Sequence, residues 1–158
     1  MSDPPSGPIS ESGKHGTSHG DVLTAISDGI VALLKDFYGK GPTRAKTYYE
    51  DDLVVCLLRG GFTRVEETLR EAGRGEEVIQ QRMAFQEVMR DRFQAVIERA
   101  TGRRVIGFMS GNQQQPDMLC EVFVLAPTDL LDDAAMEAAI GAAGTEPVPA
   151  EQPAGERR

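Results

Sequence analysis

The hydrophobic positions between residues 18 and 37 recur every three or four residues, which predicts an amphipathic helix. Ser18 and Asp21 have the spacing of an N-terminal capping box, with Asp in place of the usual Glu. Gly39 can adopt the left-handed conformation that ends a helix, and Pro42 prevents continuation beyond it. The sequence therefore predicts a first helix that Gly39 closes.

The segment after Pro42 alternates instead of following a helical period. In TRAKTYYE, residues 43–50, the side chains of Arg44, Lys46 and Tyr48 point to one side of a strand. After a turn at residues 50–52, LVVCLLR is apolar on both faces, which is typical of a central strand. We expect a hairpin whose second strand lies inside the sheet.

Two helices and two further strands follow. Residues 63–66 match the T-x-x-E capping box of a short helix, and Gly73 can close it. A long apolar stripe then runs from Val78 to Ala100 and stops at Gly102. RRVIGFMS and MLCEVFVLA read as strands joined by the loop SGNQQQPD. This order predicts an α+β fold, in which two hairpins form a four-stranded, mainly antiparallel sheet with helices on one face.

Composition divides the chain into three parts. Residues 1–20 are rich in Ser, Gly and Pro and predict a disordered tail, residues 21–126 form the α+β domain, and residues 127–158 form an acidic Ala/Pro-rich tail with a possible short helix at 130–140. The net charge is −8, of which the last segment carries −5 and residues 20–126 only −2. No secretory signal or membrane-spanning run is visible, and the two cysteines in apolar runs favour buried, reduced thiols over a disulfide, so we expect a cytoplasmic protein.

The stretch YGKGPTRAK, residues 38–46, combines glycines with cations and raises the question of a phosphate loop. A Walker-type loop follows a strand and precedes a helix, whereas this stretch leaves a helix and enters a strand, and its spacing is also wrong. A glycine-terminated helix followed by a proline turn explains the composition of this stretch. The candidate ligand-binding residues that remain are Arg44, Lys46 and Tyr48, although a solvated edge face is the simpler explanation for them.

Two further arginines are candidates. Arg82 lies inside the apolar stripe of the long helix, where it could pair with a carboxylate, bind an anion or extend to the rim. Arg104 lies at the start of the third strand, and only one of the adjacent Arg103 and Arg104 can share a face with Arg44. Few aromatic residues accompany these cations, so we do not expect nucleic-acid binding.

Catalytic side chains are scarce in the predicted domain. Both histidines, His15 and His19, lie in or beside the N-terminal tail. Cys56 and Cys120 have no second pair to form a zinc site, and their apolar flanks should raise the thiol pKa values. The carboxylate runs at residues 50–52 and 66–67 could bind a hard cation, but turn and helix-cap roles already account for them. We therefore expect no enzymatic activity, no metal and no cofactor.

Alternation leaves an apolar surface that the helices cannot hide. Leu53, Val55 and Leu57 face one side of the second strand, and the three residues between them, which are also apolar, face the other. Monomers rarely leave a contiguous apolar area of that size in water. A second subunit, the segment at residues 127–143 or a partner protein must cover it, and a homodimer is the commonest solution.

The span from residue 21 to residue 125 resembles a known family. Its segments YGKGPTRAKTYYEDDLVVCLLRGGFTRVEETL, GRGEEVIQQRMAFQEVM, IERATGRRVIGFMSG and DMLCEVFVL are similar to those of the small bacterial MpsC-like proteins, over about two-thirds of the chain. The resemblance implies an accessory protein linked, in some members, to a membrane system that generates membrane potential or takes up inorganic carbon and cations. It carries no agreed catalytic residues and does not explain the long polar tails.

The residues predict a non-catalytic binding protein, and the resemblance implies an accessory or regulatory role in which it reaches a membrane transport complex through peripheral protein contact. The alternative is a small sensor module that binds an anionic metabolite or nucleotide. It would use Arg44 and Lys46, with Arg82 as a further contact.

Overall fold

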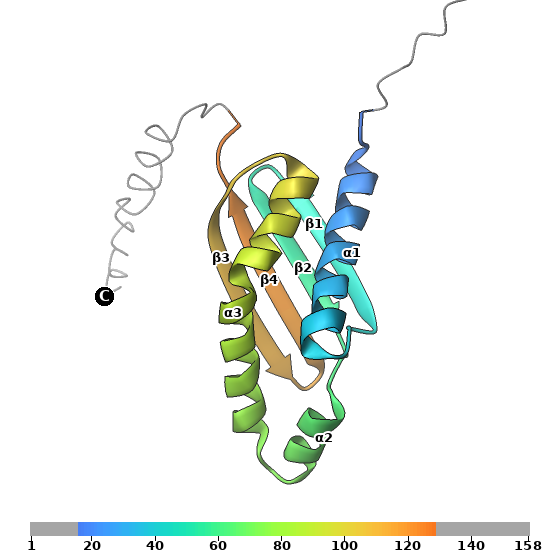
Figure 1. The fold of residues 1–158 in the computed structure, drawn as a ribbon, viewed down its shortest axis with the longest axis vertical. Coiled ribbons are helices and arrows are strands. Elements are labelled where there is room, and N and C mark those ends of the chain that lie inside the picture. Colours follow the sequence, from blue (N-terminus) through green and yellow to red (C-terminus); the bar gives the residue numbers. More distant parts are fainter. Residues whose placement is uncertain (1–15, 129–158) are drawn as a thin grey trace, which may run out of the picture.

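The computed structural model describes residues 16–128, which fold as an α+β domain with the predicted order of elements (Figure 1). None of the helices within these residues is long and apolar enough to cross a membrane. Residues 1–15 of the predicted N-terminal tail and the predicted helix at 130–140 lie outside the described residues, whereas residues 19 and 20 of that predicted tail form the start of α1. The elements are α1 (His19–Tyr38), β1 (Arg44–Glu50), β2 (Leu53–Arg59), α2 (Arg64–Glu71), α3 (Gly75–Thr101), β3 (Val105–Gln114) and β4 (Asp117–Leu125).

The four strands form one antiparallel sheet with the order β1-β2-β4-β3. Each predicted hairpin is present, and the pairing of β2 with β4 joins the two hairpins into one sheet. The doubly apolar strand β2 is central, as its sequence predicts, and the more polar strand β1 is an edge.

Helices α1 and α3 lie side by side on one face of the sheet (Figure 1). Their approach is close at Gly29, where an added Cβ atom would lie 2.6 Å from a methyl carbon of Val96. The sandwiched core contains apolar residues from both helices and from β2 and β4: Ile26, Ile30, Leu34, Val54, Cys56, Leu58, Met89, Phe93, Val96, Ile97, Phe123 and Leu125.

Both predicted capping boxes are present. Ser18 accepts a hydrogen bond from the backbone N–H of Asp21, and Thr63 accepts one from the backbone N–H of Glu66. At the other end of α1, Gly39 has a left-handed conformation with φ 84°, as expected for a glycine that ends a helix. Local sequence signals therefore fix where these helices begin and end.

The third strand is longer than predicted. It continues through Gln114 and β4 begins at Asp117, so most of the predicted loop at residues 110–117 is paired backbone. Its polar side chains are compatible with a strand because β3 is a sheet edge, where the backbone pairs without the side chains having to be buried. Cys120 is also only half-buried, because it lies on the face opposite to that of the buried Cys56.

Candidate functional site

The face of the sheet opposite α1 and α3 carries no helix within residues 16–128 (Figure 1). We call this surface the open face. The alternation of side chains assigns four residues of each strand to it. They are Arg44, Lys46, Tyr48 and Glu50 on β1, Leu53, Val55, Leu57 and Arg59 on β2, Met118, Cys120, Val122 and Val124 on β4, and Gly107, Met109, Gly111 and Gln113 on β3.

The open face is largely apolar, and its most exposed apolar side chains lie on the edge strands and at the end of β2. Leu53, Tyr48 and Met109 are 43%, 50% and 61% exposed, and the remaining aliphatic side chains are half-buried. Around Gly111 and Cys120 the face is hollowed by a shallow cavity of about 190 Å³. The predicted surplus of apolar surface is therefore present on the described domain.

The predicted ligand-binding residues do not form one site. Arg44, Lys46 and Tyr48 come together on the open face of β1, where the Lys46 ammonium lies 5.0 Å from the centre of the Tyr48 ring. Arg104 precedes β3, at the opposite edge and the opposite end of the sheet. Arg82 belongs to α3, on the helix-covered side. A single small ligand on the β1 face could not contact Arg82 or Arg104.

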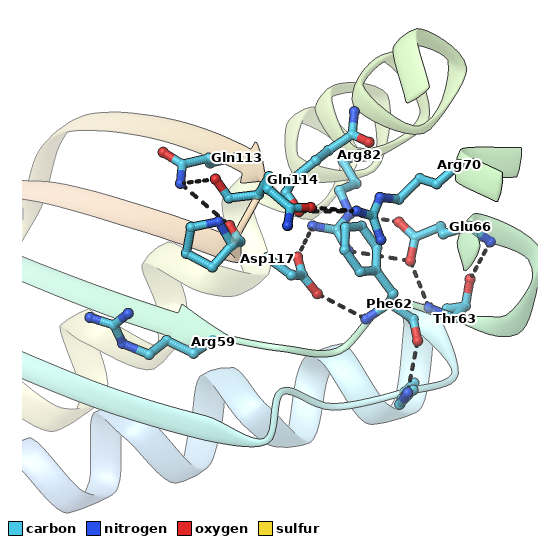
Figure 2. A network of polar contacts seen from close by, with 12 residues as sticks. Arg59, Phe62, Thr63, Glu66, Arg70, Arg82, Gln113, Gln114 and Asp117 are labelled. Atoms are coloured by element: carbon cyan, nitrogen blue, oxygen red, sulfur yellow. Dashed lines mark hydrogen bonds and ion pairs between the residues drawn. The ribbon is translucent and has the colours of Figure 1, made fainter. Parts of the chain in front are cut away.

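Arg82 is the centre of a buried ion-pair network (Figure 2). Its Nε lies 2.6 Å from Glu66 Oε1, and its Nη1 lies 2.7 Å from Asp117 Oδ1. The third nitrogen, Nη2, donates to Glu66 Oε2 at 3.3 Å. The guanidinium also lies over the ring of Phe62, at 4.3 Å from its centre. Of the alternatives that the sequence leaves open for Arg82, pairing with carboxylates is the one observed.

The same carboxylates bind the surrounding backbone. Glu66 Oε2 accepts from the N–H of Thr63 at 2.7 Å, and Asp117 Oδ2 accepts from the N–H of Phe62 at 3.1 Å. The hydroxyl of Tyr38 donates to Glu66 Oε1. The network therefore connects the end of α1, the start of α2, α3 and β4. All three guanidinium nitrogens of Arg82 are bonded within it and the side chain is only 3% exposed, so Arg82 joins these elements and presents almost no surface to an external anion.

The network shifts the pKa values of its members. Burial alone would raise the pKa of Glu66, but hydrogen bonds from Arg82, Tyr38 and Thr63 hold it below its usual value. Burial and the neighbouring Glu66 raise the pKa of Tyr38 to about 12. Glu66 is consequently charged, and Tyr38 neutral, at any physiological pH.

A second buried carboxyl group, on Glu121, did not emerge from the sequence. It lies on the helix side of β4, is completely buried, and accepts a hydrogen bond of 3.1 Å from the amide of Gln86. Burial raises its pKa to about 7, although Ser110 and Gln86 act in the opposite direction. The alternation of β4 contains the signal, because Glu121 shares its face with the buried Phe123 and Leu125.

The pKa values of both thiols shift in the direction that the sequence predicts, although only Cys56 is fully buried. Both are free, and burial raises the pKa of Cys56 to about 11. Burial also raises the pKa of the half-buried Cys120. Neither thiol is therefore activated as a nucleophile at neutral pH.

Comparison with known proteins identifies one relationship. A family model described as "Na+-translocating membrane potential-generating system (MpsC)" matches residues 18–127, which is nearly the whole of the described domain. No curated protein and no solved structure shows a significant match to the chain.

Proposed function

The chain belongs to the MpsC family, and from this premise we propose that it is a non-catalytic accessory or regulatory protein of a membrane-potential-generating system. In this proposal it acts by binding proteins. The observation that carries the proposal is the open face, an exposed apolar surface on a domain whose most unusual charged group, Arg82, is fully bonded within its buried ion-pair network.

The proposed partner at the open face is a second copy of the chain. Symmetric dimers are the commonest way in which soluble proteins cover such a surface. The homodimer then meets the membrane system through peripheral protein contacts. Direct binding to an anionic lipid surface is disfavoured by the net charge of −5 on residues 127–158. The free thiols of Cys56 and Cys120 suit a cytoplasmic location, where thiols remain reduced.

The proposal is tested by placing a charge at the centre of the open face. We expect Val122→Lys to convert a dimer into a monomer in light scattering at tens of micromolar protein, because a buried unpaired ammonium at an interface is strongly unfavourable. In a host that depends on this protein, the variant should also lower the membrane potential reported by a voltage-sensitive dye. Val88→Lys is the matched control, since Val88 is 71% exposed on α3, away from the open face.

Two results would contradict the proposal. A wild-type chain that is monomeric at these concentrations would exclude the homodimer. A folded, monomeric Val122→Lys variant that supports the full membrane potential would exclude the open face as the surface through which the protein acts.

A further inference from the structure

We propose that two copies of the chain pack open face to open face about a two-fold axis that runs across the strands. In this arrangement Arg44 of each copy meets Glu50 of the partner copy, and Met109 of each copy enters the hollow at Gly111 of the partner copy. The inference rests on the proposed function, and it deepens it by specifying which surfaces of the two copies meet.

The open face is built as four rows that run across the strands. Strand register defines the rows, because directly paired residues lie side by side. A two-fold axis between the second and third rows exchanges the first row with the fourth and the second with the third. The rows are Arg44, Arg59, Met118 and Gln113; Lys46, Leu57, Cys120 and Gly111; Tyr48, Val55, Val122 and Met109; and Glu50, Leu53, Val124 and Gly107.

Charge is distributed unevenly along these rows. The first two rows carry the basic residues Arg44, Arg59 and Lys46, whereas the fourth carries Glu50 and adjoins the acidic turn at residues 51–52. An axis across the strands lays β1 over β1, so it brings Arg44 of one copy to Glu50 and the acidic turn of the other. Arg103 and Arg104 lie at the same end as Glu50 but at the opposite edge of the sheet, before β3. An axis along the strands would bring the two basic ends together. Electrostatic complementarity therefore selects the first orientation.

Shape selects the same orientation independently. Met109 is the most exposed apolar side chain of the open face, and Gly111 lies two residues along the same strand, where an added Cβ would meet no atom within 4 Å. Gly111 is not among the glycines with positive φ, so the backbone does not require a glycine there. The axis across the strands places each Met109 over the partner's hollow. The axis along the strands would oppose Met109 to the exposed Tyr48 instead.

The centre of the proposed interface is apolar throughout. Leu57 opposes Val55 of the other copy, and Cys120 opposes Val122, so no charged side chain is buried there. Four strands about 4.8 Å apart and seven residues long give a face of roughly 19 Å by 23 Å. This projected area is below that of a standard interface, so we expect a dimer that dissociates in the micromolar range. In a dimer of this affinity, the charged residues at the ends of the interface have a measurable influence on the dissociation constant.

Charge reversal tests the orientation. Arg44→Glu places two acidic residues against each other at both ends of the dimer, and Glu50→Arg does the same with two basic residues. Each variant should raise the dimer dissociation constant about tenfold, as measured by analytical ultracentrifugation. An equimolar mixture of the two variants should form a heterodimer of near wild-type affinity, because every charge then meets its opposite. Asp91→Arg, at an exposed position of α3, is the matched control.

Filling the hollow tests the shape argument. Gly111→Leu should leave the monomer fold and its melting temperature unchanged, because the position is open in one copy. In the dimer the new side chain occupies the space that receives Met109, so the dissociation constant should rise at least tenfold. Gly111→Ser, which leaves most of the hollow free, should retain the dimer and serves as the control.

The outcomes separate the two proposals. A monomeric wild-type chain overturns both the homodimer and this arrangement. A wild-type dimer whose affinity is unchanged by Arg44→Glu, Glu50→Arg and Gly111→Leu leaves the homodimer standing and overturns the arrangement. Weakening by each single variant, with recovery in the mixture of the two charge variants, supports the arrangement, because residues 44 and 50 lie roughly 20 Å apart within one copy and cannot compensate each other there.

Discussion

Glu66 and Glu121 are both completely buried carboxyl groups, and yet their pKa values move in opposite directions. Burial acts on both and raises both. Around Glu66, hydrogen bonds from the Arg82 guanidinium and from Tyr38 outweigh burial. Glu121 forms no ion pair within residues 16–128, and its hydrogen-bonded neighbour Gln86 is neutral. The comparison shows that a neighbouring cation determines whether the pKa of a buried carboxyl group in this fold is lowered or raised.

The two carboxyl groups therefore give opposite dependences of stability on pH. The pKa of Glu121 is about 7 in the folded protein, above its ordinary value of about 4.5, so its contribution is complete below pH 4.5 and is lost as the pH rises through 7. The folded pKa of Glu66 lies below 4.5, so its contribution is present above that pH and is lost as the pH falls. We expect maximal stability in weakly acidic solution.

The largest expected effect comes from removing the cation at Glu66. Arg82→Met leaves Glu66 and Asp117 buried without their shared partner, so the free energy of unfolding at pH 7 should fall by about 3–5 kcal/mol in urea titrations. Arg64→Met is the matched control, because Arg64 pairs with Glu67 at the surface. That change should stay within about 0.5 kcal/mol. A loss below about 1 kcal/mol for Arg82→Met would show that the cation is not what keeps Glu66 charged.

The second effect concerns Glu121, the buried acid that forms no ion pair within residues 16–128. Between pH 5 and pH 8 the wild-type protein should lose up to about 3 kcal/mol of stability as Glu121 ionises, the equivalent of its pKa displacement. Glu121→Gln should remove this loss, so the variant is the more stable protein at pH 8 and similar to wild type at pH 5. Urea midpoints at unit pH intervals measure the difference. Parallel curves for the two proteins would show that Glu121 does not titrate in this range.

The third effect removes the charge of the paired acid while keeping its shape. Glu66→Gln should cost about 2 kcal/mol at pH 7, because Arg82 retains Asp117 and the new amide oxygen still accepts hydrogen bonds. The cost should shrink as the pH is lowered below 4.5, where wild-type Glu66 becomes protonated. Thermal melting at pH 3, 5 and 7 measures it. A cost that is independent of pH would mean that the Glu66 charge contributes nothing.

Most of the fold could be predicted because its signals are local. The capping residues Ser18 and Thr63, the closing Gly39 and the alternation of residues 53–59 each lie within one element, and the structure reproduces all of them. The length of β3 was wrong because its polar end, residues 111–114, carries loop-like side chains while its backbone pairs with β4. Backbone pairing at a sheet edge leaves little trace in side-chain chemistry.

The site could be predicted only in part, because its partners are distant in sequence. Arg82 was identified as unusual, but its carboxylate partner Asp117 lies 35 positions away and carries no pattern of its own. Glu66 was explained by its capping role, which concealed that the same carboxylate is also buried against Arg82. Glu121 was detectable from strand alternation, but only a structure shows that its neighbour is the amide of Gln86.

The smallest expected effect separates the capping role of Glu66 from its ion pair. Thr63→Ala removes the hydroxyl that accepts from the Glu66 N–H at 3.2 Å, but it leaves the Thr63 N–H that binds the Glu66 carboxylate. The free energy of unfolding should therefore fall by about 1 kcal/mol, the usual cost of a lost N-cap, with the acid side of the pH profile unchanged. Ser18→Ala, in the exposed capping box of α1, should cost about the same. A larger loss for Thr63→Ala that disappears below pH 4.5 would mean that the cap also holds the carboxylate on Arg82, in which case the contrast with Glu121 depends on Thr63 as well as on the cation.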